Sequence, residues 1–190
     1  MAGVTPARKS QTTREQWIAA AQDALIHSGV EGVRPESLAA TLGALPEDYF
    51  HHFADARAIL AALIERWETI SLKPLAQVDA LETADPFAQF ETFMAAWVES
   101  EPYYPVYDSA VRHWARIDDD VAARVNALDD TRIARLTAIF RALGHEEEEA
   151  FIRARITYFH QIGYYAMGVK ESSERRRHHW PLYVWILTGR

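Results

Sequence analysis

The helical architecture of this chain is most easily predicted from residues 33–53, whose sequence is VRPESLAATLGALPEDYFHHF. Pro35 suits the first turn of a helix, because its fixed φ matches the helix and its missing N–H is not needed there. Gly43 is typical of a helix end, and Pro46 then opens a second short helix. The packing of that helix is expected to come from its aromatic residues, Tyr49, Phe50 and Phe53. The order of helix, glycine turn and helix predicts a helix-turn-helix, an arrangement whose second helix enters the major groove of DNA.

Helical patterns flank this stretch on both sides. An apolar stripe at helical spacing predicts a helix over residues 13–27, capped by Thr13 and closed by Gly29. Asp55 caps a further helix, and the stripe of that helix consists of Ile59, Leu60, Leu63, Ile64 and Trp67. We therefore predict a three-helix domain over residues 1–56.

The rest of the chain is also predicted to be helical. Proline 74 and the mixed residues up to 84 are interpreted as a link, and Asp118, Glu146 and Ser172 open later helices. Pro181 is expected to kink or restart the last helix, because its ring breaks the backbone hydrogen-bond ladder. No segment shows sustained strand alternation, so the prediction is an all-α protein of about nine helices, with a second domain over residues 57–190.

Composition excludes several classes of protein. Hydrophobic residues make up 49% of the chain, and there is no cysteine for disulfides or thiolate metal sites. Residues 1–11 are polar, unlike a secretory signal, and no apolar run approaches the ~20 residues of a membrane span. We expect a cytoplasmic protein that makes no contact with membranes.

The charge of the chain does not favour a nucleic-acid partner. The formal net charge is −7, and residues 1–72 hold six basic against nine acidic residues, a net charge of −3. The basic residues cluster in the N-terminal arm. Because an acidic surface repels phosphate, the position of each basic residue matters more than the total.

Several elements together resemble the TetR family of transcriptional regulators. The elements are the helix from Trp17 to Leu25, Gly29, Leu38-Ala39, Leu42-Gly43 and above all Phe50-His51-His52-Phe53, which matches the family's ending of the recognition helix. Residues 111–118 and 140–144 are similar to ligand-domain segments of one branch of the family. The similarity extends over nearly the whole chain.

The resemblance implies a homodimer with an N-terminal DNA-binding domain and a C-terminal domain for ligand binding and dimerisation. The last two long helices would form a four-helix bundle with the partner. The helix predicted over residues 149–169 is apolar most of the way round, so it must be covered on two faces. A central core helix of a monomer would explain the same pattern.

The resemblance also places the DNA-contacting residues, which are Arg8, Lys9, Arg14, Arg34, Ser37, Leu45, Pro46, Glu47, Asp48, Tyr49, His51, His52 and Arg57. Arg34, Asp48, Phe50 and Ala56 depart from the family's usual residues, and most of these changes remove a phosphate contact. The carboxylates of Glu47 and Asp48 either accept a hydrogen bond from a cytosine amino group or only favour the helix N-terminus.

Aromatic residues gather in the predicted C-terminal domain. Each combines an apolar body with a polar tip or a flat face, which suits a pocket for a small apolar or aromatic molecule. The candidate pocket residues are Trp67, Phe90, Phe93, Trp97, Tyr103, Tyr104, Tyr107, His113, Trp114, Tyr158, His160 and Tyr164. Core packing would explain the same residues.

Catalytic and metal-binding motifs are not found in the sequence. It contains no nucleophile elbow, phosphate loop or dinucleotide fingerprint. Adjacent histidines such as His51 and His52 diverge by about 100° on a helix, so they do not share one metal ion. We expect no metal, no cofactor and no enzymatic activity.

The function that follows is a ligand-responsive transcriptional repressor that binds a palindromic operator as a homodimer. The alternative is a protein of the TetR fold that has lost operator binding and acts through protein or ligand contacts. The acidic balance of residues 1–72 motivates this alternative.

Overall fold

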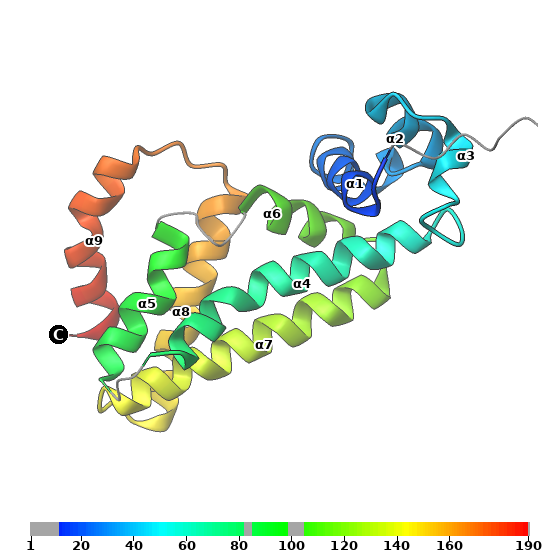
Figure 1. Cartoon of the computed structure of the whole chain (residues 1–190). Coiled ribbons are helices and arrows are strands. Elements are labelled where there is room, and N and C mark those ends of the chain that lie inside the picture. The colour runs from blue at the N-terminus through cyan, green and yellow to red at the C-terminus, as the bar shows by residue number, and fades with distance from the viewer. Residues whose placement is uncertain (1–11, 82–84, 99–104, 190) are drawn as a thin grey trace, which may run out of the picture. The chain divides into compact units, whose positions relative to one another are not determined.

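A computed structural model describes residues 12–81, 85–98 and 105–189 of the chain (Figure 1). Within these residues the regular structure is entirely helical, which confirms the prediction of about nine α-helices. The α-helices are α1 (Arg14–Ser28), α2 (Pro35–Leu42), α3 (Pro46–Tyr49), α4 (Ala58–Asp79), α5 (Pro86–Val98), α6 (Pro105–Trp114), α7 (Asp119–Ala142), α8 (Glu147–Ala166) and α9 (Ser173–Thr188), with a 3-10 turn, η1, at Val30–Gly32.

The chain divides into two compact units, Met1–Arg66 and Trp67–Arg190. The division falls inside α4, about three helical turns beyond the boundary predicted at residue 56. Arg66, the last residue of unit 1, is linked to α1. Its Nε donates to the Gln22 side chain at 2.8 Å, and its guanidinium also pairs with Glu15.

Local signals in unit 1 act as the sequence predicts. Thr13 caps α1 by accepting a hydrogen bond from the Gln16 N–H, and the Gln16 side chain accepts from the Thr13 N–H in return. Trp17, Ala21 and Leu25 lie buried on one stripe of α1. This stripe supplies the surface on which α2 packs.

The turn between α2 and α3 depends on Gly43. Its φ of 62° lies in the left-handed region, where an L side chain is strained. In this conformation the N–H of Ala44 donates to the Ala39 carbonyl at 3.0 Å and closes the end of α2. The chain can then enter α3 at Pro46 after only two more residues.

Unit 2 is built around the consecutive helices α7 and α8, which have the most extensive helix–helix contact in the described part of the chain. Helices α5 and α9 also contribute to its core, where Phe90, Phe93, Leu136 and Phe140 are fully buried. The part of α4 in this unit runs beside α7 in Figure 1, and three side-chain links join the two helices. The links are Arg124 to Glu68, Arg132 to the Ser71 carbonyl, and Arg135 to Asp79.

The link predicted at proline 74 was wrong, because α4 continues through Pro74 to Asp79. The missing N–H of proline weakens one turn, but tertiary packing outweighs this cost. Leu75 and Val78, just beyond the proline, are buried in the unit 2 core. Pro181 likewise lies inside α9, so the last helix does not restart there.

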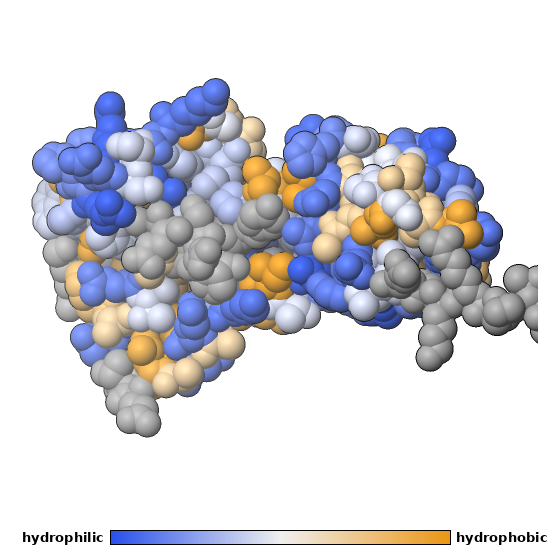
Figure 2. Space-filling view, turned by 45° about the horizontal axis from the view of Figure 1, so that its top comes forward, coloured by the Kyte–Doolittle hydropathy of each residue, from blue (hydrophilic) through white to orange (hydrophobic). Residues whose placement is uncertain are grey.

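The described surface is mainly hydrophilic on the face shown in Figure 2, where hydrophobic residues form small separate groups. Among the helices described, none combines the length and the apolar character that crossing a membrane requires.

Candidate functional site

Helix α3 is anchored in unit 1 by Tyr49, whose side chain is fully buried. Its ring lies edge-on to Trp17, with 5.4 Å between centroids, and stacks on Phe53 at 4.9 Å. Its hydroxyl donates to the Asp55 carbonyl at 3.0 Å. The side chain of Tyr49, which is predicted to contact DNA, is thus buried and bonded inside the unit.

Phe50 departs from its prediction in the opposite direction to Tyr49. The sequence predicts that it packs inward, but its side chain is 57% exposed. Residues 49 and 53 are four apart and share the inner face, which leaves residue 50 on the outer one. Glu47, three residues before Phe50, and His51, one residue after it, are also exposed.

Asp48 has a structural role. Its side chain is buried, and a carboxylate oxygen accepts a hydrogen bond from the Leu45 N–H at 3.3 Å. A carboxylate at this position also favours the positive end of the helix dipole. Of the two explanations for this acid, the contact at the helix N-terminus is the one seen in the structure, and base contact by Asp48 stays a prediction.

His52 is also turned toward the protein. It is half-buried, and its Nε2 lies 2.8 Å from the carbonyl oxygen of Thr12, which it reaches across the start of α1. Five exposed residues remain in α3 and at its two ends. Four of them were predicted to contact DNA, and the fifth, Phe50, was predicted to pack inward. We call these five residues the recognition face: Leu45, Pro46, Glu47, Phe50 and His51.

Basic side chains are exposed elsewhere in unit 1, but none belongs to the recognition face. Arg14 and Arg57 are exposed, and the Arg14 guanidinium lies 5.3 Å from the centroid of the Phe53 ring. Arg34 makes an exposed ion pair with Glu31 at 3.4 Å, which is weak enough to open for another anion. Ser37 on α2 is exposed, whereas Arg8 and Lys9 lie outside the described residues.

The predicted aromatic pocket of unit 2 is largely a packed core. The buried members are Trp67, Phe90, Phe93, Trp97, Tyr107, Trp114 and Tyr158. His113 is exposed on α6, and Tyr103 and Tyr104 lie outside the described residues. For the buried residues the packing explanation therefore fits better than a ligand-lined cavity.

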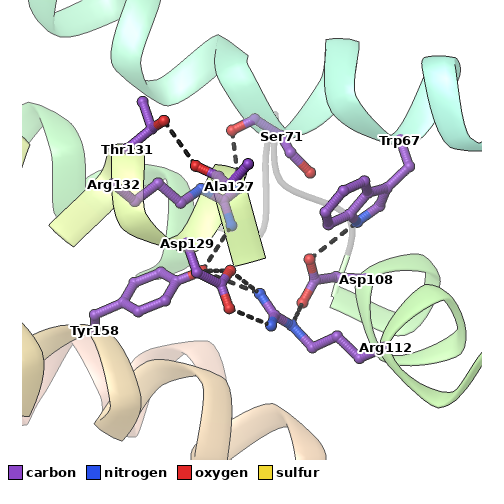
Figure 3. Close-up of polar contacts among 9 residues, drawn as sticks. All are labelled: Trp67, Ser71, Asp108, Arg112, Ala127, Asp129, Thr131, Arg132 and Tyr158. Carbon is purple, nitrogen blue, oxygen red and sulfur yellow. Dashed lines mark hydrogen bonds and ion pairs between the residues drawn. The ribbon is translucent and has the colours of Figure 1, made fainter. Parts of the chain in front are cut away.

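A polar network crosses this core and was not predicted (Figure 3). Arg112 of α6 donates to both oxygens of Asp129 on α7, at 2.8 and 2.7 Å, and to Asp108 one turn back, at 2.7 Å. Asp108 also accepts from the indole N–H of Trp67 at 3.0 Å. Burial opposes the charge of Arg112, but the two carboxylates outweigh this effect and raise its pKa, so it stays protonated.

Tyr158 of α8 completes the network. Its hydroxyl donates to Asp129 at 2.6 Å and accepts from Arg112 at 3.0 Å and from the buried Arg132 at 3.2 Å. Burial raises the pKa of Tyr158 to about 12. Two arginines, Arg112 and Arg132, balance two carboxylates, Asp108 and Asp129, and the hydrogen bonds of the network link α4, α6, α7 and α8.

A second candidate site is a small, open hollow between α8 and α9. Its lining is mostly aromatic with a few polar groups, and the lining residues are His160, Gln161, Tyr164, Glu171, Arg176, Trp180 and Tyr183. Two of them, His160 and Tyr164, were predicted to bind a ligand. Partial burial lowers the pKa of His160, which favours a neutral ring that can donate or accept a hydrogen bond.

Arg176 is one of three polar residues of this α8–α9 hollow, with Gln161 and Glu171, that sequence analysis missed. It stands in a run of three arginines, a pattern typical of a solvated surface, but it donates to the Trp97 carbonyl at the end of α5 and to the Tyr165 hydroxyl. Its guanidinium also lies 5.2 Å from the centroid of the Tyr164 ring. Trp180 and Tyr183 are three residues apart on α9, a spacing that could have indicated a shared face.

The outer faces of α8 and α9 carry an unusual concentration of exposed hydrophobic side chains. We call them the α8–α9 apolar face: Phe151, Ile152, Ile156, Phe159, Leu182, Tyr183, Trp185 and Ile186. These are eight of the fifteen large hydrophobic side chains that are exposed in the described residues. Large exposed hydrophobic patches are typical of interaction sites.

No protein-family model and no curated protein matches the sequence. Solved structures do match its fold over nearly the whole length. A transcriptional regulator of Rhodococcus sp. Rha1 shares 20% identity, with a TM-score of 0.69 and 93% of this chain and 96% of that chain covered. A TetR transcriptional regulator of Legionella pneumophila shares 12% identity, with a TM-score of 0.66 and coverage of 93% and 99%.

A third similar structure is AibR in complex with isovaleryl coenzyme A and operator DNA, which shares 13% identity at a TM-score of 0.69, with 92% of this chain and 97% of that chain covered. The chain thus has the fold of TetR-type transcriptional regulators, as its sequence predicts.

Proposed function

We propose that this chain is a homodimeric, ligand-responsive transcriptional regulator that represses by binding a palindromic operator. The observation that carries the proposal is the recognition face, which is held outward by a helix whose inner residues are locked in the unit 1 core. The fold supports it, since similar structures are transcriptional regulators and one of them is bound to operator DNA.

The recognition face meets the mechanical requirement for reading DNA. A side chain can select a base only if its helix is held rigidly, and Tyr49 fixes α3 through two ring contacts and one hydrogen bond. Arg14, Arg34 and Arg57 lie exposed on the flanking elements, where they can bind phosphates on either side of a groove. Arg8 and Lys9 would add backbone contacts from the N-terminal arm.

The α8–α9 apolar face supports dimerisation through the last two helices. Ile152, Ile156 and Phe159 follow a spacing of four and three residues, so they form one continuous stripe along α8. Leu182 and Ile186 are four residues apart on α9 and extend the surface. A second copy of the chain presents the same stripe, and two-fold pairing of identical surfaces is the commonest form of soluble oligomer.

The α8–α9 hollow supports effector binding beside that interface. Aromatic walls with a few polar groups suit a small apolar or aromatic molecule, and His160 can orient it by a hydrogen bond. Because the two half-sites of an operator lie about one helical turn, ~34–36 Å, apart, a small pivot at the dimer interface misplaces both recognition faces. Effector binding would release DNA in this way.

A gel-shift titration on the DNA flanking the protein's own gene tests the proposal. We expect a discrete complex that survives excess unrelated DNA and weakens steeply as salt rises, because phosphate contacts release counterions. A complex that unrelated DNA displaces equally well would refute operator binding. It would instead favour the alternative of a protein of this fold that acts through protein or ligand contacts.

A further inference from the structure

The recognition face has an unusual chemical composition for a surface that reads DNA. Leu45 is 43% exposed and Phe50 57% exposed, and they are the two large hydrophobic side chains that are exposed in the described residues of unit 1. Single exposed hydrophobic residues are common on any surface. Here, however, both flank the same four-residue helix, Leu45 at its N-cap and Phe50 at its C-cap.

The side chains that usually read purines are missing from this segment. Residues 43–56 contain no Arg, Lys, Asn or Gln. Two-pronged hydrogen bonding to guanine by Arg or Lys, and to adenine by Asn or Gln, is therefore not available from this segment. The recognition face still offers an acceptor, the exposed carboxylate of Glu47, and the hydrogen-bonding imidazole of His51. Leu45, Pro46 and Phe50 add apolar contact.

The carboxylate and the apolar side chains match the pyrimidines in the major groove. Thymine presents a 5-methyl group, which apolar side chains contact, and cytosine presents an amino group, which donates to a carboxylate. We propose that Phe50, assisted by Leu45, reads thymine methyl groups in the operator half-site. This inference rests on the proposed DNA-binding function and names the base feature that the recognition face selects.

The setting of Phe50 suits this role. Its ring lies edge-on to Tyr49, with 5.2 Å between ring centroids, and Tyr49 is itself immobilised by Trp17 and Phe53. A ring braced in this way loses little conformational freedom on binding. A methyl group placed against it is removed from water, which is worth about fourfold in affinity by the usual value for one buried methyl or methylene.

The experiment uses DNA sites selected by the full-length protein from a random-sequence library. Each thymine of a selected half-site is replaced in turn by deoxyuridine, which lacks only the 5-methyl group. We expect a loss of about threefold to fivefold at one or two positions. The same substitutions are then measured with Phe50→Ala, Phe50→Leu and Ile117→Ala.

With Phe50→Ala, the ratio of affinities for thymine and uracil should fall to about one at those positions. Phe50→Leu, which keeps an apolar side chain, should retain part of the ratio, and Ile117→Ala should retain all of it. Ile117 is a matched control because it is 70% exposed and lies between α6 and α7. Thermal melting of each variant checks that it is folded.

Three results would overturn the inference. If a selected site binds with unchanged affinity when uracil replaces each thymine, the inference about methyl groups fails while the proposed function stands. An unchanged ratio in Phe50→Ala would assign the methyl effect to another residue. If no sequence is enriched from the library, the proposed operator binding fails, and the inference fails with it.

Discussion

Arg112 donates two parallel hydrogen bonds to Asp129, at 2.8 and 2.7 Å, and this ion pair joins α6 to α7 inside unit 2. Two-pronged pairing fixes both distance and orientation, so it positions the two helices as well as attracting them. The side chains of Arg112 and Asp129 are each about 20% exposed. A third charged group, Asp108, is almost fully buried beside Arg112. Removing one member would leave the others with unbalanced charge.

We expect Arg112→Ala to lower the free energy of unfolding by about 3–5 kcal/mol, because it strands the carboxylates of Asp108 and Asp129 in the core. Urea denaturation followed by circular dichroism measures the change. Arg124→Ala is the matched control, since it breaks a more exposed pair with Glu68 and should cost about 1 kcal/mol or less. Equal losses of unfolding free energy in the two variants would show that the buried network stabilises the fold no more than an exposed ion pair does.

Tyr158 should give unit 2 a distinct response to alkaline pH. Burial raises its pKa from the ordinary 10.0 to about 12, so the folded state holds its proton more tightly than the unfolded state. Its contribution to the free energy of unfolding is then complete below pH 10 and is lost as pH rises toward 12. Measured against Tyr158→Phe in urea, the stability difference should be constant from pH 7 to 9 and shrink above pH 10. A difference that grows above pH 10 would contradict burial as the cause of the raised pKa.

Tyr49 and Phe50 are neighbours with opposite predicted roles. Tyr49→Phe removes one hydroxyl that donates to Asp55, and should cost about 0.5–1.5 kcal/mol of stability with no change in DNA affinity. Fluorescence anisotropy with a selected operator, at a temperature where both proteins are folded, measures the affinity. A tenfold loss of operator affinity in Tyr49→Phe would mean that the hydroxyl contacts DNA, which would contradict its buried position.

The α8–α9 apolar face should be covered by a second copy of the chain. Ile156→Asp places a charge in the middle of the α8 stripe, and an unpaired charge at a packed interface is strongly unfavourable. Analytical ultracentrifugation at micromolar concentration should then show twice the chain mass for the unsubstituted protein and the single mass for Ile156→Asp. Ile117→Asp is the control, since Ile117 is exposed outside α8 and α9 and the dimer should persist. A monomeric unsubstituted protein would rule the homodimer out.

Local signals in the sequence were enough to predict the helices. Thr13, Gly43 and Asp118 act on their own neighbours, so their roles as caps and turns can be inferred without knowing the fold. Pro74 shows the limit of such signals. Its local preference is to end a helix, but the burial of Leu75 and Val78 against distant helices outweighs that preference.

The candidate sites were harder to predict because exposure is decided by register. Tyr49 and Phe50 are adjacent aromatic residues, and only the direction of α3 against α1 determines which of them is buried. Arg112 and Asp129 are far apart in sequence, and nothing local indicates that they meet. In the sequence, Arg176 is one of three consecutive arginines, a pattern typical of a surface. Only the fold shows that it contacts the end of α5.

Operator reading by the recognition face can be tested by selecting bound DNA from a random-sequence library and sequencing it. We predict an enriched inverted repeat, with half-sites centred about one helical turn apart and with thymine at fixed positions in each half. Enrichment of no sequence, at a salt concentration low enough to allow binding, would contradict operator reading by this face.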